Sequence, residues 1–262
     1  MADAPPLPLS CTASSPALHQ KAEILAKKLG LPWTPGPAAP PQLVYSERGL
    51  ELRLLLGGPD TVGASVLHID FSGGRSGYRH ARNCTINQPL AKAIGIRPGV
   101  RPTVFDATAG MGADAFVLAC LGCRVIMNER SPIIGALLTD AIDRALQHPE
   151  IAGIFRDRIR LVIGDARSTL LTLDEPPETI YLDPMYPHGP NSALNSKEMR
   201  IIRAIVGDDI DGPELLTQAL LTAARRVVVK RPKGAPLLDQ RSPSHQVAMK
   251  NSRFDVYLRR HL

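Results

Sequence analysis

The sequence predicts an α/β fold in which a doubly wound parallel sheet follows a small α+β appendage. From about residue 96, short apolar runs alternate with helix-length amphipathic segments. Strands buried on both faces appear as such runs, and helices between them imply parallel pairing. An acidic residue also follows each of the first four runs, at Asp106, Glu129, Asp165 and Asp183. Because an open parallel sheet binds ligands at the carboxyl ends of its strands, these acids predict a single site.

Residues 1–70 are expected to form the appendage. Residues 1–17 are rich in Pro, Ala and Ser and predict no regular structure. Apolar segments flank Glu47-Arg48-Gly49, which indicates a β-hairpin. The expected elements are a helix over 19–29, a proline-rich connection over 32–41, and strands over 42–46, 50–56 and 66–71.

Residues 71–262 are expected to form the main domain. Its apolar runs predict strands over 104–105, 124–127, 159–163, 180–182, 227–229 and 253–258. Amphipathic spacing predicts helices over 113–121 and 132–146, and a further helical segment before 227–229. Together these elements predict a Rossmann-like α/β sandwich.

Composition is that of a soluble globular protein. Of 262 residues, 44% are hydrophobic and 21% are charged, which is enough apolar side chain for a core. No apolar run is long enough to cross a membrane, and the start lacks the pattern of a secretory signal. We therefore expect a cytoplasmic protein. The formal charge of +6 and the pI of about 9.3 favour a polyanionic partner without establishing one.

Two of the four cysteines, Cys120 and Cys123, form a Cys-x-x-Cys pair. This spacing is typical of a redox dithiol or of half a zinc site. A zinc site needs four ligands, and no second pair or histidine spacing completes one, so no metal is expected. We interpret both thiols as small apolar side chains where a helix meets a strand.

The loop Asp106-Ala107-Thr108-Ala109-Gly110-Met111-Gly112-Ala113-Asp114 follows the first run of the main domain. Gly110 and Gly112 allow a sharp turn into a helix and a close approach to a ligand. Ala115 completes a dinucleotide-like spacing, but Asp106 would repel a pyrophosphate and attract the ammonium of an amino-acid-like ligand. A tight turn capped by Asp106 is the alternative interpretation.

The next two runs end in acids that suit a nucleoside. Glu129 lies about twenty residues further on, where such sheets place an acid that binds both ribose hydroxyls, and Arg130 would close over the nucleoside. Asp165 suits an adenine amino group, with the Ala166 amide near the ring. The alternatives are a solvated Glu129–Arg130 pair and ordinary Gly-Asp turn chemistry.

The fourth run leads into Asp183-Pro184-Met185-Tyr186-Pro187, which predicts methylation of an exocyclic base amine. Such an amine reacts only when its lone pair is withdrawn from conjugation with the ring. The Asp183 carboxylate and the Pro184 carbonyl would accept the two amine hydrogens, and Tyr186 would stack on the base. A base within a helix must first leave its stack. A proline-rich turn is the alternative.

Cations near the predicted site are candidate contacts to RNA phosphates. A solvated basic edge is equally consistent with them. The candidates are Lys230 and Arg231 after a late strand, and Arg79, His80 and Arg82 before the main sheet. His188, after the proline-rich run, is a candidate for orienting the target base.

These segments resemble one family, ribosomal RNA small subunit methyltransferase J, which methylates the guanine 2-amino group in bacterial small-subunit RNA. The resemblance runs from about residue 66 to about residue 257. The matching segments are 69–74, 106–119, 122–125, 129–130, 197–200, 181–188 with Asp183-Pro184-Met185-Tyr186-Pro187-His188, and 226–232 with Val227-Val228-Val229-Lys230-Arg231-Pro232. The last two together are not general features of methyltransferases.

The resemblance implies a class I methyltransferase fold and S-adenosylmethionine as cofactor. It implies cofactor contacts at Ala113-Asp114, Glu129-Arg130, Asp165-Ala166 and Asp183. Two positions depart from the family pattern: Ala113 replaces an expected Arg, and Asp165-Ala166 replaces an expected Ser pair.

The predicted function is therefore methyl transfer to the 2-amino group of a guanine in 16S ribosomal RNA, within RNA or the small subunit. Alternatives are a DNA adenine or cytosine amino-methyltransferase, a non-catalytic RNA-binding assembly protein and a nicotinamide dehydrogenase. The stretch 187–211 is short for the target-recognition segment of a DNA enzyme.

Overall fold

The computed structural model describes residues 9–36, 40–55, 65–73, 85–185, 197–207 and 211–259. These residues form two compact units. The first contains the described residues up to Ile69, Pro132–Arg144 and the described part of His188–Gly207, and the second contains the remainder. The predicted division into domains at 1–70 and 71–262 stays a prediction.

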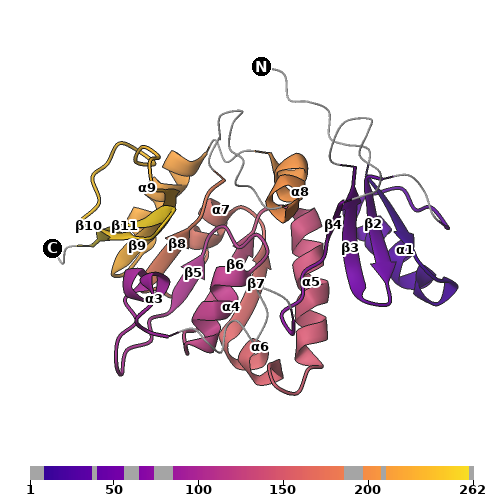
Figure 1. Cartoon of the computed structure of the whole chain (residues 1–262), viewed down its shortest axis with the longest axis horizontal. Coiled ribbons are helices and arrows are strands. Elements are labelled where there is room, and N and C mark those ends of the chain that lie inside the picture. The colour runs from indigo at the N-terminus through magenta and orange to yellow at the C-terminus, as the bar shows by residue number, and fades with distance from the viewer. Residues whose placement is uncertain are drawn as a thin grey trace. The chain divides into compact units, whose positions relative to one another are not determined.

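The second unit is built on a seven-stranded sheet (Figure 1). Its strands are β5 (Val104–Asp106), β6 (Val125–Glu129), β7 (Ile159–Ile163), β8 (Thr179–Leu182), β9 (Arg226–Pro232), β10 (His245–Ala248) and β11 (Ser252–Leu258). Their order is β10-β11-β9-β8-β5-β6-β7, and the pairs from β9 to β7 are parallel. β11 is antiparallel to both of its neighbours. The order reverses between β5 and β8, which is where such a sheet binds its ligand.

Helices cover both faces of this sheet. They are α3 (Pro89–Ile94), α4 (Ala113–Cys120), α6 (Ala152–Arg158), α7 (Ala166–Leu171) and α9 (Gly212–Thr222). Phe105 and Leu182 share a buried cluster with Leu170 of α7 and Leu216 of α9. Side chains alternate along a strand, so Tyr181 projects to the opposite face, where its hydroxyl reaches α4. The predicted doubly wound α/β sheet is confirmed.

An aromatic cluster lies on the α4 face. Phe71 packs against Phe116 of α4 and Phe155 of α6, with ring centroids 5.2 and 4.9 Å away. The strand predicted over 66–71 is shorter, because β4 spans only Ser65–Leu67. A turn follows, in which the Asp70 carboxylate accepts hydrogen bonds from the backbone and the hydroxyl of Ser72.

Cys123 is fully buried, and burial raises the pKa of its thiol to about 11, as suits an apolar core residue.

The first unit contains a smaller sheet of order β1-β2-β3-β4. The strands of this sheet besides β4 are β1 (Ser10–Ala13), β2 (Gln42–Ser46) and β3 (Gly49–Leu54). The first unit also contains a 3₁₀ turn (Pro16–Leu18), α1 (His19–Leu29), α8 (Lys197–Val206) and most of α5 (Pro132–Leu146). The predicted helix over 19–29 and the predicted hairpin are confirmed. β2 and β3 pair antiparallel through a two-residue turn, with Ser46 opposite Gly49.

The prediction that residues 1–17 lack regular structure was wrong for their second half. β1 pairs in parallel with β2, and Cys11 at its centre is fully buried. The Cys11 backbone amide also donates to Pro32 in the proline-rich connection, at 2.9 Å. The pairing partner lies about 30 residues away in sequence, so local composition gave no sign of it.

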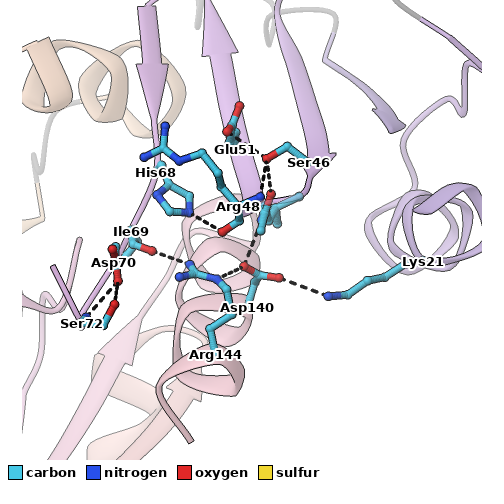
Figure 2. Close-up of polar contacts among 12 residues, drawn as sticks. Lys21, Ser46, Arg48, Glu51, His68, Ile69, Asp70, Ser72, Asp140 and Arg144 are labelled. Carbon is cyan, nitrogen blue, oxygen red and sulfur yellow. Dashed lines mark hydrogen bonds and ion pairs between the residues drawn. The ribbon is translucent and has the colours of Figure 1, made fainter. Parts of the chain in front are cut away.

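A buried carboxylate ties α5 to the hairpin within the first unit (Figure 2). Asp140 accepts hydrogen bonds from the Leu50 amide and from Arg144 Nε, both at 2.9 Å, and pairs with Lys21 Nζ at 3.3 Å. Arg144 also donates to the Ile69 carbonyl. None of the helices in the described part of the chain is long and apolar enough to cross a membrane.

Candidate active site

The glycine loop after β5 lies against the end of β6. Gly110 and Gly112 have φ angles of +54° and +74°, which favour glycine, and Gly112 is the N-cap of α4. The Ala109 amide donates to the Asn128 carbonyl at 3.0 Å, and the Gly110 amide donates to Glu129 Oε2 at 2.9 Å. The predicted loop and the predicted ribose-binding acid are therefore neighbours.

The Glu129 carboxylate is held at both oxygens. Oε2 accepts from Gly110, and Oε1 accepts from the Ser131 amide at 2.7 Å. The residue is 6% exposed. A carboxylate accepts about four hydrogen bonds, so binding to backbone amides does not by itself prevent a contact with ribose hydroxyls. The ribose contact itself stays a prediction.

Asp106 ends β5 beneath the same loop and is only 2% exposed. Its Oδ1 accepts from the Thr108 amide at 3.1 Å. Burial raises the pKa of Asp106 well above its usual range; the Thr108 bond opposes this, and the carboxylates of Asp114, Asp183 and Glu129 add to it. The site thus contains more negative charge than it neutralises internally, which favours a cationic ligand.

Asp165 follows β7 and is the N-cap of α7, where it accepts from the Arg167 amide at 2.8 Å. The Arg167 side chain also binds its carboxylate, and these bonds lower the pKa of Asp165. Arg130 pairs with Asp211 Oδ1 at 3.0 Å, and Arg167 lies 3.4 Å from the other oxygen of Asp211. An adenine amino group would therefore share Asp165 with Arg167.

Asp183, after β8, lies beside the glycine loop. Its amide donates to Thr108 Oγ1 at 2.6 Å, and its carboxylate binds Lys230 Nζ at 2.9 Å. The side chain is 40% exposed, so a substrate can approach it. Pro184, which follows, is buried. Asp183 thus combines a fixed backbone with an accessible carboxylate.

Lys230 joins Asp183 to the start of α4. Its ammonium also binds Asp114 Oδ2 at 3.0 Å, and the Tyr181 hydroxyl donates to the same oxygen at 2.6 Å. Ala113 is the first residue of α4, next to Asp114. The neighbouring Arg231 is only 3% exposed, and its guanidinium donates to the Pro236 carbonyl. A phosphate contact by Arg231 would require this side chain to be uncovered first.

Five of the predicted substrate residues lie outside the described residues. These are Tyr186, His188, Arg79, His80 and Arg82. Their roles stay predictions. The described residues among the predicted ones lie at or near the ends of β5, β6, β7, β8 and β9. Hydrogen bonds join Glu129 and Asp183 to the glycine loop and Lys230 to Asp183.

Four residues at the site were missed by sequence reasoning. Thr108, Arg167, Tyr181 and Asp211 each contact a predicted site residue. Tyr181 had a signal in the sequence, since it lies two positions before Asp183 and therefore projects to the same face. Asp211 had none, because α9 approaches the site only in the folded chain.

The chemistry of these groups fits S-adenosylmethionine. Its ammonium and sulfonium are cationic, and Asp106 is a buried acid among three others. Its ribose hydroxyls suit an acid fixed at the glycine loop, as Glu129 is.

Comparison with known proteins agrees with this site. A family described as putative SAM-dependent methyltransferase matches residues 24–259. Ribosomal RNA small subunit methyltransferase J from Desulfotalea psychrophila is 52% identical over 243 residues, covering 92% of each chain. The protein of that name from Thioalkalivibrio sulfidiphilus is 50% identical, covering 95% of this chain and 97% of the relative. The chain belongs to the ribosomal RNA small subunit methyltransferase J family.

A solved structure supports the same assignment. The SAM-dependent methyltransferase from Neisseria gonorrhoeae is 33% identical, covers 94% of each chain and has a TM-score of 0.69. The chain therefore has the class I methyltransferase fold and uses S-adenosylmethionine. Membership of the methyltransferase J family decides against the nicotinamide dehydrogenase.

Proposed function

We propose that the protein transfers the methyl group of S-adenosylmethionine to the 2-amino group of a guanine in 16S ribosomal RNA. Relatives that share about half of its residues are named for the small-subunit RNA. The positive formal charge of +6 suits an RNA partner. The natural substrate would be this RNA or the small subunit that contains it, and the protein would act in the cytoplasm.

The observation that carries the proposal is the placement of Asp183. Its backbone is bonded to Thr108 of the glycine loop, and its carboxylate is 40% exposed. A hydrogen-bond acceptor in this position lies between the glycine loop and solvent. It suits a substrate that donates hydrogens, as an exocyclic amine does.

The residues of the chain would act by positioning. Asp183 and the Pro184 carbonyl would accept the two amine hydrogens, and Tyr186 would stack on the guanine. Stacking of this kind stabilises the bound base by about 1–3 kcal/mol. Bound S-adenosylmethionine supplies an electrophilic methyl group. Holding two reactants in line can remove several kcal/mol of the barrier, on the order of 7–11 in the best cases. No strong general base is required, because the amine proton can leave after attack.

Other residues would hold the two ligands. Glu129 would bind the ribose, Asp106 the ammonium, and Asp165 with Ala166 the adenine, while Arg130 would close over the adenosine. Gly110, Ala113 and Asp114 would line the cofactor from the glycine loop and α4. On the RNA side we assign Arg79, Arg82 and His188, and Arg231 once it is uncovered.

The test is methyl transfer to small subunits from a strain that lacks the enzyme, with radiolabelled cofactor and mapping of the modified base. We expect the wild-type protein to label one guanine at its 2-amino group. Asp183→Ala should abolish transfer while the melting temperature stays close to that of the wild type. Asp183→Asn should retain only a small fraction of the rate, because a neutral amide is a weaker acceptor.

Asp157→Asn is the matched control, because Asp157 is an exposed acid at the opposite end of the sheet. It should transfer methyl groups at the wild-type rate. Full activity in Asp183→Ala would refute the proposal. Label in DNA, or at another atom of the RNA base, would assign a different substrate.

A further inference from the structure

We propose that Lys230 is a positioning residue for methyl transfer, whose ammonium holds the Asp183 carboxylate in place and does not bind an RNA phosphate. The inference rests on the function proposed above, since that function gives Asp183 its task. It also revises the role that the sequence suggested for Lys230. Three features carry it: the register of β8 and β9, a second carboxylate that binds the Lys230 ammonium, and the charges around that ammonium.

The register of the sheet places Lys230 opposite Asp183. β8 and β9 are parallel neighbours, with Leu182 opposite Val229. The next residues along the two strands are Asp183 and Lys230, so their side chains leave the sheet on the same face. The Lys230 Nζ lies 2.9 Å from Asp183 Oδ2. The contact follows from strand pairing and does not require a chance rotamer of a surface lysine.

A second carboxylate fixes the ammonium. Asp114 Oδ2 lies 3.0 Å from Lys230 Nζ and accepts the Tyr181 hydroxyl at 2.6 Å. Tyr181 is 1% exposed and cannot move without disturbing the core. The order of contacts is therefore Tyr181, Asp114, Lys230, Asp183, running from the core to the accessible carboxylate. A lysine that binds phosphate would instead extend into solvent.

Charge explains why Lys230 stays with these partners. Burial alone would lower the pKa of Lys230, but the carboxylates of Asp183 and Asp114 outweigh burial and raise it. Removing the ammonium would leave the carboxylates of Asp114 and Asp183 close together with no cation between them. Their repulsion would turn Asp183 away from its present direction. A carboxylate accepts about four hydrogen bonds, so the bond to Lys230 is compatible with one to an amine.

The test compares Lys230→Met and Lys230→Arg in single-turnover methyl transfer at saturating cofactor and small subunits. A displacement of about 1 Å at a reacting centre costs about 100-fold in rate, and we expect that loss in Lys230→Met. The concentration of small subunits that gives half the maximal rate, measured in a separate titration at saturating cofactor, should not change. Lys230→Arg should recover part of the rate, because the guanidinium keeps the charge but not the shape. A phosphate contact would instead be satisfied fully by Arg.

The salt dependence of binding to small subunits gives an independent readout. Loss of one phosphate contact reduces the slope of log affinity against log salt by about 1. We expect no such change in Lys230→Met. Lys233→Met is the control, since Lys233 is an exposed lysine just beyond the same strand, and its transfer rate at saturation should equal that of the wild type.

Three results would overturn the inference. They are a Lys230→Met rate within about threefold of the wild type, a salt slope reduced by about 1, and a wild-type rate in Lys230→Arg. If the wild-type protein itself transfers no methyl group to small subunits, the proposed function fails and this inference fails with it. That result is distinct from the other three, because it appears before any variant is compared.

Discussion

At the scale of single residues, Asp106 shows how the site is prepared for a cation. A carboxyl that is 2% exposed and faces three other acids has its pKa raised well above the usual range by burial, and the neighbouring acids add to the effect. Without ligand, Asp106 therefore retains its proton to a higher pH than an exposed Asp does. The ammonium of the cofactor would stabilise the ionised form and release that proton.

This coupling predicts that cofactor affinity depends on pH. As pH rises above the ordinary pKa of an aspartate, about 3.9, affinity for S-adenosylmethionine should increase, by at most about tenfold per unit, over the range in which Asp106 loses its proton in the free protein. Titration calorimetry across this range measures the dependence. Asp106→Asn should bind more weakly, with a flatter profile. A wild-type affinity that stays constant over the range would contradict the role of Asp106.

The stability of the ligand-free protein should depend on pH with the opposite sign to the cofactor affinity. The folded state holds the Asp106 proton more tightly than the unfolded state does, because the folded pKa is raised. The contribution of Asp106 to stability therefore falls as pH rises from the unfolded pKa toward the folded one. Bound cofactor should remove this loss.

At the scale of elements, the strands with strong local signals could be predicted from the sequence. β7 and α5 match their expected ranges of 159–163 and 132–146, because continuous apolar runs and helical spacing are local properties. β1 and β10 were missed, since each is four residues long and is defined by the strand with which it pairs. The helix α3 was also missed, although it begins with Pro89 and ends before Gly95, which are usual start and stop signals.

The prediction of the site had the same limit. Acids that follow apolar runs could be located by position alone, which found Asp106, Glu129, Asp165 and Asp183. Other contacts around the site could not be located in this way, because those between Lys230 and Asp114 and between Arg130 and Asp211 join segments about 80 or more residues apart. The sequence showed Lys230 only as a cation near the site, and the fold shows which groups it neutralises.

Asp140 on α5 provides a test of how elements are held together in the first unit (Figure 2). Its carboxylate accepts a hydrogen bond from the Leu50 amide and pairs with Arg144 and Lys21. Burial alone would raise the pKa of Asp140, but these contacts outweigh burial and lower it. Asp140→Ala should cost about 3 kcal/mol of unfolding free energy, because it removes the acceptor of the buried Leu50 amide and the carboxylate that neutralises the partly buried Arg144. Urea denaturation of the full chain at pH 7 measures the loss.

The pH dependence of this loss has a defined sign. A lowered folded pKa gives stability that is present above the unfolded value of about 3.9 and disappears as pH falls through the folded value. The difference between wild type and Asp140→Ala should therefore shrink below about pH 4. Asp143→Ala on the exposed side of α5 is the control and should change stability by less than about 0.5 kcal/mol. Equal losses in the two variants would contradict the account of Asp140.

At the scale of the whole molecule, the sheet order explains why distant acids meet. The chain builds β5, β6 and β7 toward one edge and then resumes at β8 on the other side of β5. The carboxyl ends of all four strands therefore face one region, and the glycine loop after β5 lies at its centre, bonded to Glu129 and to Asp183. Topology thus brings four separate sequence positions together in one region of the second unit.

The most direct test of this convergence is calorimetric titration of S-adenosylmethionine into the wild-type chain and into Glu129→Gln, with exposed Glu175→Gln as control. We predict one binding site per chain and wild-type affinity in Glu175→Gln. Affinity in Glu129→Gln should fall by about 10-fold to 100-fold, because a charge-assisted hydrogen bond contributes about 1.5–3 kcal/mol. Wild-type affinity in Glu129→Gln, or equally tight binding of NAD, would contradict the account.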